Sequence, residues 1–329
     1  MRNYLARRLL GMIPTLAVIS VLVFIIIQLP EGDIVTSTLD RLSATGVDLS
    51  DDRIQNLRAQ YNLDQPLPIQ YLGWIGNFIT GDMGFSYLFA RPVNELVWER
   101  IGYTLLITVC ALIFTWVMAL PIGIYSAVRQ YSIADYSFTT IGLIGLATPN
   151  FLIALVLMYL GYSWFGLSFG GLFSPEYLNA PWSWERFTDM LSHLWIPVVV
   201  IGTSGMAITM RLMRANLLDE LKKPYVTTAR AKGVPPLKLL LKYPVRIAIN
   251  PFISTIGLLL PALISGEAIV GVVLNLPTTG PLLVQALIAQ DMYLAGSLIM
   301  LLSMLTVVGM LLSDLLLAWV DPRIRYERT

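Results

Sequence analysis

Long apolar segments alternate with shorter polar ones along the chain, which is the pattern of a protein that crosses a membrane several times. A helix needs about 20 apolar residues to span a bilayer, and six segments approach or exceed that length. They are residues 9–29, 101–128, 136–164, 194–212, 248–271 and 293–319. We therefore predict an all-α membrane protein with six transmembrane helices. We expect the first segment to be a true span, because it is longer than the apolar core of a cleaved signal peptide.

Composition agrees with this prediction, and the placement of charge adds an orientation. Apolar residues make up 56% of the chain and charged residues 13%, whereas soluble domains have about 25% charged residues. With the N-terminus inside, the cytoplasmic segments hold 16 of the 22 lysines and arginines. Because short cytoplasmic loops are enriched in these residues, we predict that both termini lie inside. The net charge of +1 gives no indication of a nucleic-acid partner.

The predicted spans divide the chain into four parts. Residues 1–29 contain the N-terminus and the first span, and residues 30–100 form a large outer loop. Residues 101–319 form a five-helix core, with a cytoplasmic loop at 213–247, and residues 320–329 are a cytoplasmic tail.

Helices are also expected within the outer loop. Ser50 can cap a helix that carries Asp51 and Asp52 in its first turn, where the helix dipole favours acidic residues. Residues 69–79 are rich in aromatic and aliphatic side chains, which suits a helix at the headgroup boundary. Residues 91–100 have the pattern of a short surface helix that leads into the second span.

The cytoplasmic loop contains a short helix with sharp boundaries. Pro224 fits the first helical position, Gly233 fits the left-handed position after the end, and Pro235 and Pro236 prevent continuation. Small residues cover much of this helix of about nine residues, so that another protein can approach its backbone closely. Such a helix indicates a docking element for a cytosolic partner. The alternative is a plain connector that is basic only because of the topology.

Residues in and after this helix resemble the coupling loop of permease subunits of ABC importers, in the dipeptide, oligopeptide and nickel branch. The pattern of that branch is roughly Tyr-Val-x-Thr-Ala-Arg-Ala-Lys-Gly, followed by Arg-x-Ala-x-x-Pro. The matching residues here are Tyr225, Val226, Thr227, Thr228, Ala229, Arg230, Ala231, Lys232 and Gly233, then Arg246, Ala248 and Pro251.

The resemblance extends over nearly the whole chain. Residues 1–30 resemble the first span of the family, and residues 147–151 resemble its third. The outer loops of the family have counterparts at 61–67, 81–86, 275–283 and 291–293.

The resemblance implies a B-type permease subunit with the type I importer fold, in a multi-pass protein of a bacterial or archaeal cell membrane. Its partners are a second, related permease, two cytosolic ATPase subunits and an extracytoplasmic binding protein. The outer loop at 30–100 resembles the scoop-like loop of that subunit type. The substrate class expected first is di- and oligopeptides, and the alternatives within the branch are oligosaccharides, opines and nickel chelates.

Two departures from the family pattern limit what the resemblance carries over. The loop of importers in general begins Glu-Ala-Ala, where this chain has Thr227, Thr228 and Ala229. Many relatives have a glutamate at the position of Gly271, and here the nearest carboxylate is Glu267. Any pathway role that this glutamate has in the relatives therefore cannot be assigned to Gly271.

Glu267 is itself a candidate for the transport pathway or its outer gate, because carboxylates inside a membrane usually face the bundle interior or a water-filled cavity. The alternative is an acid exposed to water at the interface. Pro149 and Asn150, in the segment that resembles the third span, are further pathway candidates.

A basic face follows the coupling loop, and it has two interpretations. Lys238, Lys242 and Arg246 recur at intervals of four residues. This spacing favours a helix whose basic groups reach anionic membrane lipid, and the alternative is a second contact with the ATPase. We expect a break at Pro244 in either case.

The sequence contains no motif for catalysis, so we expect a transporter subunit rather than an enzyme. It has no Gly-x-x-x-x-Gly-Lys-Ser/Thr phosphate loop, and ATP and magnesium are therefore expected on partner subunits. His193 and Cys110 are the single histidine and the single cysteine, which argues against a metal site. His193, at the outer start of the fourth span, is expected to be an interfacial anchor.

Two other classes of protein compete with the importer. An ion-coupled secondary transporter would need charges near the middle of the membrane or unwound half-helices. A membrane scaffold or sensor would recruit no ATPase.

Overall fold

The computed structural model describes residues 2–29, 35–36, 39, 55, 64–86, 88–165 and 170–320. Its described residues form two compact units, which we treat separately. One unit contains residues 103–277 and the chain from 308 onward, and the other contains residues 2–102 and 278–307. The predicted helix capped by Ser50 and the tail at 321–329 lie outside the described residues.

Among the described residues, four helices are long and apolar enough to cross a membrane. They are α1 (Arg2–Gln28), α5 (Val93–Val128), α8 (Trp184–Leu221) and α14 (Met292–Val320), and they include the predicted first, second, fourth and sixth spans. The predicted helix at 91–100 is present from Val93, but it is the first part of α5 and not a distinct short helix, and Arg91 and Pro92 form strand β2.

The predicted third span is not a single helix. It consists of α6 (Ile133–Ala147) and α7 (Asn150–Phe165), which meet at an angle of 103°. The residue before a proline is disfavoured in helical conformation, and Thr148 has an extended backbone with ψ 125° immediately before Pro149. The Thr148 hydroxyl donates to the carbonyl of Ile144 and satisfies an acceptor at the end of α6.

Helix α12 (Asn250–Val273) covers the predicted fifth span. Its described apolar part, Leu263–Val273, is shorter than a full span, so the six-span prediction is supported only in its coarser form, a helical protein with several membrane helices. At its end, the N–H of Asn275 donates to Val272 and that of Leu276 to Gly271. Asn275 accordingly takes a positive φ of 51°, and this pair of bonds closes the helix as a Schellman motif.

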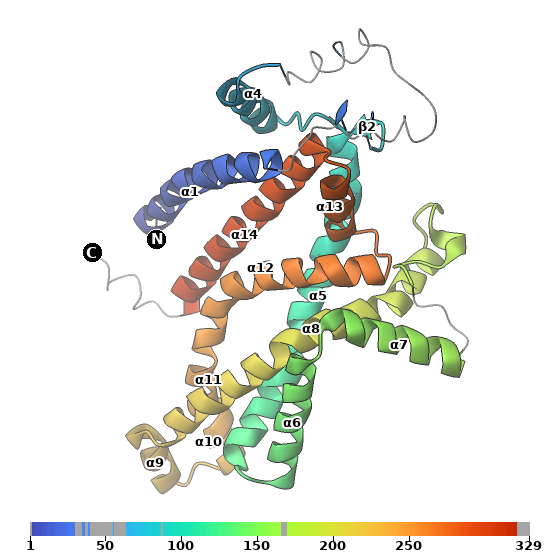
Figure 1. Ribbon diagram of the computed structural model, residues 1–329. Helices are drawn as coiled ribbons and strands as arrows, with labels where there is room; N and C mark the ends of the chain where they lie inside the picture. The colour runs from blue at the N-terminus through green and yellow to red at the C-terminus, as the bar shows by residue number, and fades with distance from the viewer. Residues whose placement is uncertain are drawn as a thin grey trace. The chain divides into compact units, whose positions relative to one another are not determined.

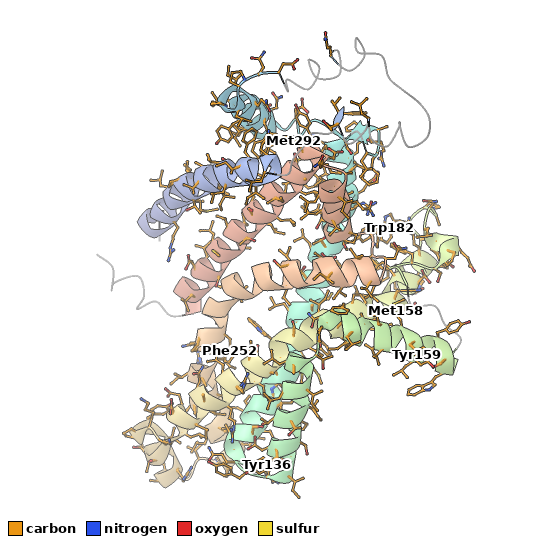
Figure 2. All side chains as sticks on the ribbon, viewed as in Figure 1. Tyr136, Met158, Tyr159, Trp182, Phe252 and Met292 are labelled. Carbon is orange, nitrogen blue, oxygen red and sulfur yellow. The ribbon has the colours of Figure 1, made fainter. Side chains whose placement is uncertain are left out.

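The exposed side chains of these helices are predominantly apolar, as in a protein whose outer surface meets lipid. Figure 2 shows Tyr136 on α6 and Tyr159 on α7 directed outward, and both side chains are more than half exposed. Phe252 of α12 is buried and packs against Met213 and Leu217 of α8.

In the second unit, α4 (Leu67–Thr80) confirms the predicted helix at 69–79. Leu72 and Ile79 on one face of this helix are exposed, and its position at the headgroup boundary stays a prediction. Trp74 and Phe78 are buried in a core with Phe24 of α1 and Leu294 of α14. Burial of both aromatic rings removes a large apolar area from solvent, so the segment predicted to be an outer loop contributes to the core of this unit.

The hairpin of this unit, strands β1 (Phe85–Ser86) and β2, is hydrogen-bonded to the start of α14. The Ser86 hydroxyl donates to the buried Asp291 carboxylate over 2.6 Å, and the N–H of Leu294 donates to the same carboxylate at the helix start. Gly84 lies against the ring of Tyr293, where a Cβ would come within 2.6 Å. Residues 81–86 and 291–293 were two distant stretches of sequence that each resemble a loop of the family. In the structure they are in contact.

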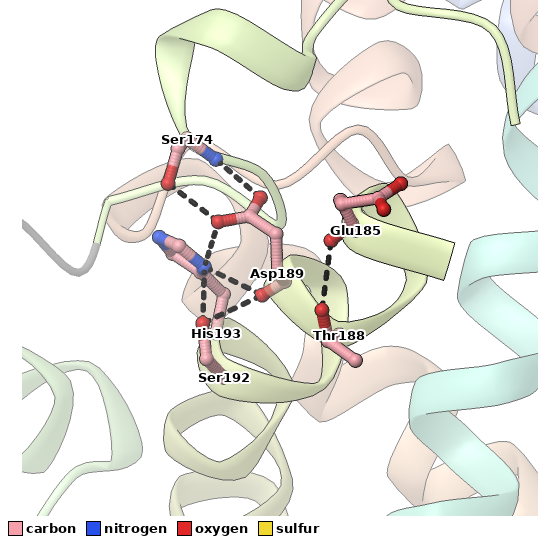
Figure 3. A network of polar contacts seen from close by, with 6 residues as sticks. All are labelled: Ser174, Glu185, Thr188, Asp189, Ser192 and His193. Atoms are coloured by element: carbon pink, nitrogen blue, oxygen red, sulfur yellow. Dashed lines mark hydrogen bonds and ion pairs between the residues drawn. The ribbon is translucent and has the colours of Figure 1, made fainter. Parts of the chain in front are cut away.

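In the first unit, Asp189 of α8 anchors the loop that precedes α8 (Figure 3). Its carboxylate accepts hydrogen bonds from the N–H of Ser174 over 2.8 Å and from the Ser174 hydroxyl over 2.6 Å. Nδ1 of His193 lies 2.9 Å from the carbonyl oxygen of Asp189. His193 is 8% exposed, so its side chain is an internal member of this network, and its predicted place at the membrane interface stays a prediction.

Candidate functional site

Helix α9 (Pro224–Ala231) is the short helix predicted in the cytoplasmic loop, and it follows α8 after two exposed lysines (Figure 1). Lys223 has an extended backbone, with φ −70° and ψ 146°. Pro224 then occupies the first turn, where its missing N–H leaves no intrahelical bond unmade. The predicted start of the helix is confirmed.

The end of α9 is closed by its own backbone. The N–H of Gly233 donates to the carbonyl of Arg230 over 3.0 Å, and that of Val234 donates to Ala229 over 3.3 Å. This is a Schellman motif, and it requires the left-handed conformation that Gly233 adopts with φ +74°. The predicted stop at Gly233 is confirmed, and the helix has eight residues where we expected about nine.

The residues that resemble a coupling loop divide between two faces of α9. Val226 and Ala229 are buried and form a small core with Leu239, while Tyr225 and Val234 pack against this core. Ala229 is therefore not part of the surface of small residues that we expected.

The opposite face of α9 is exposed and polar. It contains no large apolar side chain and combines small groups with two cations. Its members are Pro224, Thr227, Thr228, Arg230 and Ala231, with Lys232 and Gly233 in the turn that follows. We call these exposed residues the α9 surface.

Tyr225 connects α9 to the last turn of α8. Its phenol donates a hydrogen bond to a carboxylate oxygen of Glu220 over 2.5 Å. Burial, with a further contribution from the hydrogen bond to Glu220, raises the pKa of Tyr225. The phenol is a donor at neutral pH, as any tyrosine is. Because its pKa is raised in the folded state, the stability that it contributes is lost only when the pH rises above the ordinary tyrosine range of about 10.

Two short helices return the chain from α9 to the membrane helices. Helix α10 (Pro236–Lys242) buries Leu239 against α9 and exposes Leu237 and Leu241. Helix α11 (Pro244–Ala248) begins after the predicted break.

The packing of α11 is internal to the first unit. Val245 and Ala248 are buried with Met213 and Leu217 of α8. Each of these helices thus contacts the next one in the chain, from α8 through α9 and α10 to α11. The last of them, α11, packs against α8 again.

An ion pair that the sequence analysis missed links α6 to α8. Arg214 donates to a carboxylate oxygen of Asp135 over 2.8 Å, and the side chain of Asp135 is 3% exposed. Asp135 also lies in the first turn of α6, where Ser132 caps the helix. The cap was visible in the sequence, but the partner lies 79 residues away and no local pattern indicates it.

The structure brings the three pathway candidates into one region of the first unit. Glu267 of α12 is 1% exposed, which does not agree with the alternative of an acid exposed at the interface. The neighbouring Gly266 faces Asn150, whose Nδ2 would lie 3.7 Å from a Cβ at Gly266. Asn150 directly follows Pro149 at the start of α7, so the bend between α6 and α7 lies beside α12.

Comparison with known proteins places these features in a family context. The family model for the binding-protein-dependent transport system inner membrane component matches residues 119–326. A second family model, for the N-terminal part of such membrane components, matches residues 1–108.

Individual relatives match over almost the full length. The chain is 36% identical to the oligopeptide transport system permease protein AppB of Bacillus subtilis, over 99% of this chain and 100% of that protein. It is 33% identical to a putative peptide permease protein of Brucella suis, over 99% of each chain. It is 32% identical to the glutathione transport system permease protein GsiC of Escherichia coli K12, over 99% of this chain and 100% of that protein.

The Schellman turn at Gly233 predicts the outcome of two substitutions. No atom lies within 4 Å of a Cβ at this position, so the cost of Gly233→Ala is conformational, at about 1–2 kcal/mol. Gly233→Asn is the matched control and should cost less, because asparagine tolerates the left-handed region. Hydrogen exchange at the backbone amides of positions 233 and 234 should be faster in Gly233→Ala than in Gly233→Asn. Equal acceleration in both variants would contradict this account of the turn.

Proposed function

Because the chain belongs to the family of binding-protein-dependent transport system inner membrane components, we propose that it imports di- and oligopeptides with energy from ATPase subunits that dock on α9. The family makes it a membrane permease subunit of an ABC importer, a transporter component and not an enzyme. It is a multi-pass membrane protein that works in a complex with other subunits. The identity of those subunits, the topology and the substrate are our proposals.

The observation that carries the docking proposal is the construction of α9. The helix has a fixed start and a fixed end, and its inner face is packed on Leu239. Its outer face offers small side chains and two cations, so a groove in another protein can approach the backbone closely without displacing a large residue. A rigid helix of this kind can be gripped and moved as one body.

The remaining partners and the topology follow from the family and from charge placement. We propose a second, related permease, two ATPase subunits and an extracytoplasmic binding protein, in a bacterial or archaeal cell membrane. The excess of lysine and arginine in the segments assigned to the inside supports six spans with both termini inside. In this arrangement the loop at 30–100 faces the binding protein, and α9 faces the cytosol.

The substrate class rests on the relatives. One is an oligopeptide permease protein, another a putative peptide permease protein and a third a glutathione permease protein, and glutathione is itself a small peptide. We therefore place di- and oligopeptides before oligosaccharides, opines and nickel chelates.

The pathway proposal rests on Glu267, Pro149 and Asn150. Glu267 is 1% exposed within an apolar helix, and carboxylates inside a membrane usually face the bundle interior or a substrate pathway. The bend at Pro149 brings Asn150 to the same stretch of α12. We propose that this region lines the pathway or its outer gate.

A large charged side chain on the α9 surface should prevent docking. Thr227→Arg is expected to reduce co-purification of the ATPase subunits at least tenfold, a loss of about 1.4 kcal/mol in binding free energy. Gln130→Arg, at another exposed position assigned to the inside, is the matched control. If native complexes contain no ATPase, or if Thr227→Arg retains it fully, a secondary transporter or a scaffold becomes the better interpretation.

The substrate proposal predicts which ligands stimulate the complete complex. With its binding protein in proteoliposomes, ATP hydrolysis should rise severalfold when di- or oligopeptides are added. Oligosaccharides, opines and nickel chelates should leave the rate at its basal level. Stimulation by one of these three classes, without stimulation by peptides, would replace the proposed substrate.

Removal of the charge at Glu267 tests the pathway. Glu267→Gln keeps the shape of the side chain and should reduce the rate of peptide uptake at least tenfold, with unchanged retention of ATPase subunits. Asp314→Asn, at the second acid within a predicted span, is the control and should transport at the normal rate. Normal uptake by Glu267→Gln would exclude a role for the carboxylate charge.

A further inference from the structure

Between α8 and α9, one side-chain hydrogen bond and two local backbone bonds restrict the bending of the chain. The linker is Lys222 and Lys223, both exposed, and the start of α9 has no side-chain cap. Backbone bonds from Lys223 to Glu220 and from Val226 to Lys223 hold its turns locally. Two exposed residues between two rigid helices are a natural place for bending.

The hydrogen bond from Tyr225 to Glu220 crosses this linker. It joins the second residue of α9 to the last turn of α8 over 2.5 Å, and it is partly buried. A hydrogen bond to a charged acceptor is shorter and stronger than one between neutral groups. A tyrosine phenol with its ordinary pKa of about 10 is already protonated throughout the physiological range, and the direction of the shift at Tyr225 agrees with its role as a donor.

The other end of α9 returns to α8 by packing. Ala229 and Val226 contact Leu239 of α10, and α11 then places Val245 and Ala248 against α8. Consequently the start of α9 is joined to α8 by a hydrogen bond. The rest of α9 is joined to α8 indirectly, through apolar packing on α10 and of α11 on α8.

From this geometry we propose that Tyr225 and Glu220 form a latch that makes α9 and α8 move together. A displacement of α9 then passes into the membrane helix and does not bend the Lys222–Lys223 linker. Tyr225 is on this view a positioning residue, because its hydroxyl faces Glu220 and not the α9 surface. The inference rests on the proposed docking of an ATPase on α9.

The test uses the complete complex with its binding protein in proteoliposomes. In Tyr225→Phe the ring and its packing remain, and only the hydroxyl is lost. We expect retention of the ATPase subunits and basal ATP hydrolysis within about twofold of the unmodified complex, since the exposed face of α9 is unchanged. The number of peptides transported per ATP hydrolysed should fall at least fivefold.

Further variants separate a latch from general destabilisation. Tyr243→Phe removes a hydroxyl at the edge of the same small core and is the matched control, with an unchanged transport ratio. Glu220→Ala should reproduce the effect of Tyr225→Phe, and the double variant should be no worse than either single one. Glu220→Gln keeps an acceptor for the phenol and should restore most of the ratio.

The outcomes distinguish this inference from the docking proposal. An unchanged transport ratio in both Tyr225→Phe and Glu220→Ala would overturn the latch while leaving docking intact. Loss of the ATPase subunits from Tyr225→Phe would assign the hydroxyl to docking and also overturn it. If Tyr225→Phe does not fold, Glu220→Ala breaks the same bond and decides the question. Failure of Thr227→Arg to release the ATPase would reject docking whatever the latch variants do.

Discussion

The need to pair every backbone donor and acceptor at helix ends is the constraint on which the rest of this structure depends. A buried backbone group without a partner costs about as much free energy as a lost hydrogen bond in any folded protein. Helices α4, α9 and α12 meet this need in one way, with a left-handed residue after the helix and a pair of backward backbone bonds, at Gly81, Gly233 and Asn275. Each closure also reverses the chain, so helix ends and changes of direction coincide. The sharp boundaries of α9 are one instance of this general solution.

Local signals explain why some of the site was predictable from the sequence. Pro224 and Gly233 act through the backbone of their own neighbours, and both boundaries of α9 appear where those residues predict them. The break before Pro244 follows for the same reason. The long apolar segments likewise indicate membrane helices, because length and composition alone decide whether a helix can span a bilayer.

Features that depend on distant partners were not predictable in this way. Whether Pro149 bends a helix slightly or separates two helices by 103° depends on what packs around it. The aromatic residues of α4 suit a membrane surface or a core equally well, and contacts with α1 and α14 decide for the core. The ion pair of Asp135 and Arg214, and the burial of His193 and Ala229, likewise arise from packing between segments far apart in the chain.

Near each of its ends, helix α8 has a carboxylate that accepts hydrogen bonds from a neighbouring segment; we call each of these contacts a clasp. Asp189 holds Ser174 of the preceding loop, and Glu220 holds Tyr225 of the following helix. The two acids are separated by 31 residues, or about 46 Å of helix at 1.5 Å per residue. Any free energy by which an event at one clasp changes equilibrium binding at the other must act equally in the reverse direction. Coupling carried by this helix between the loop before α8 and α9 would therefore act with equal free energy in both directions.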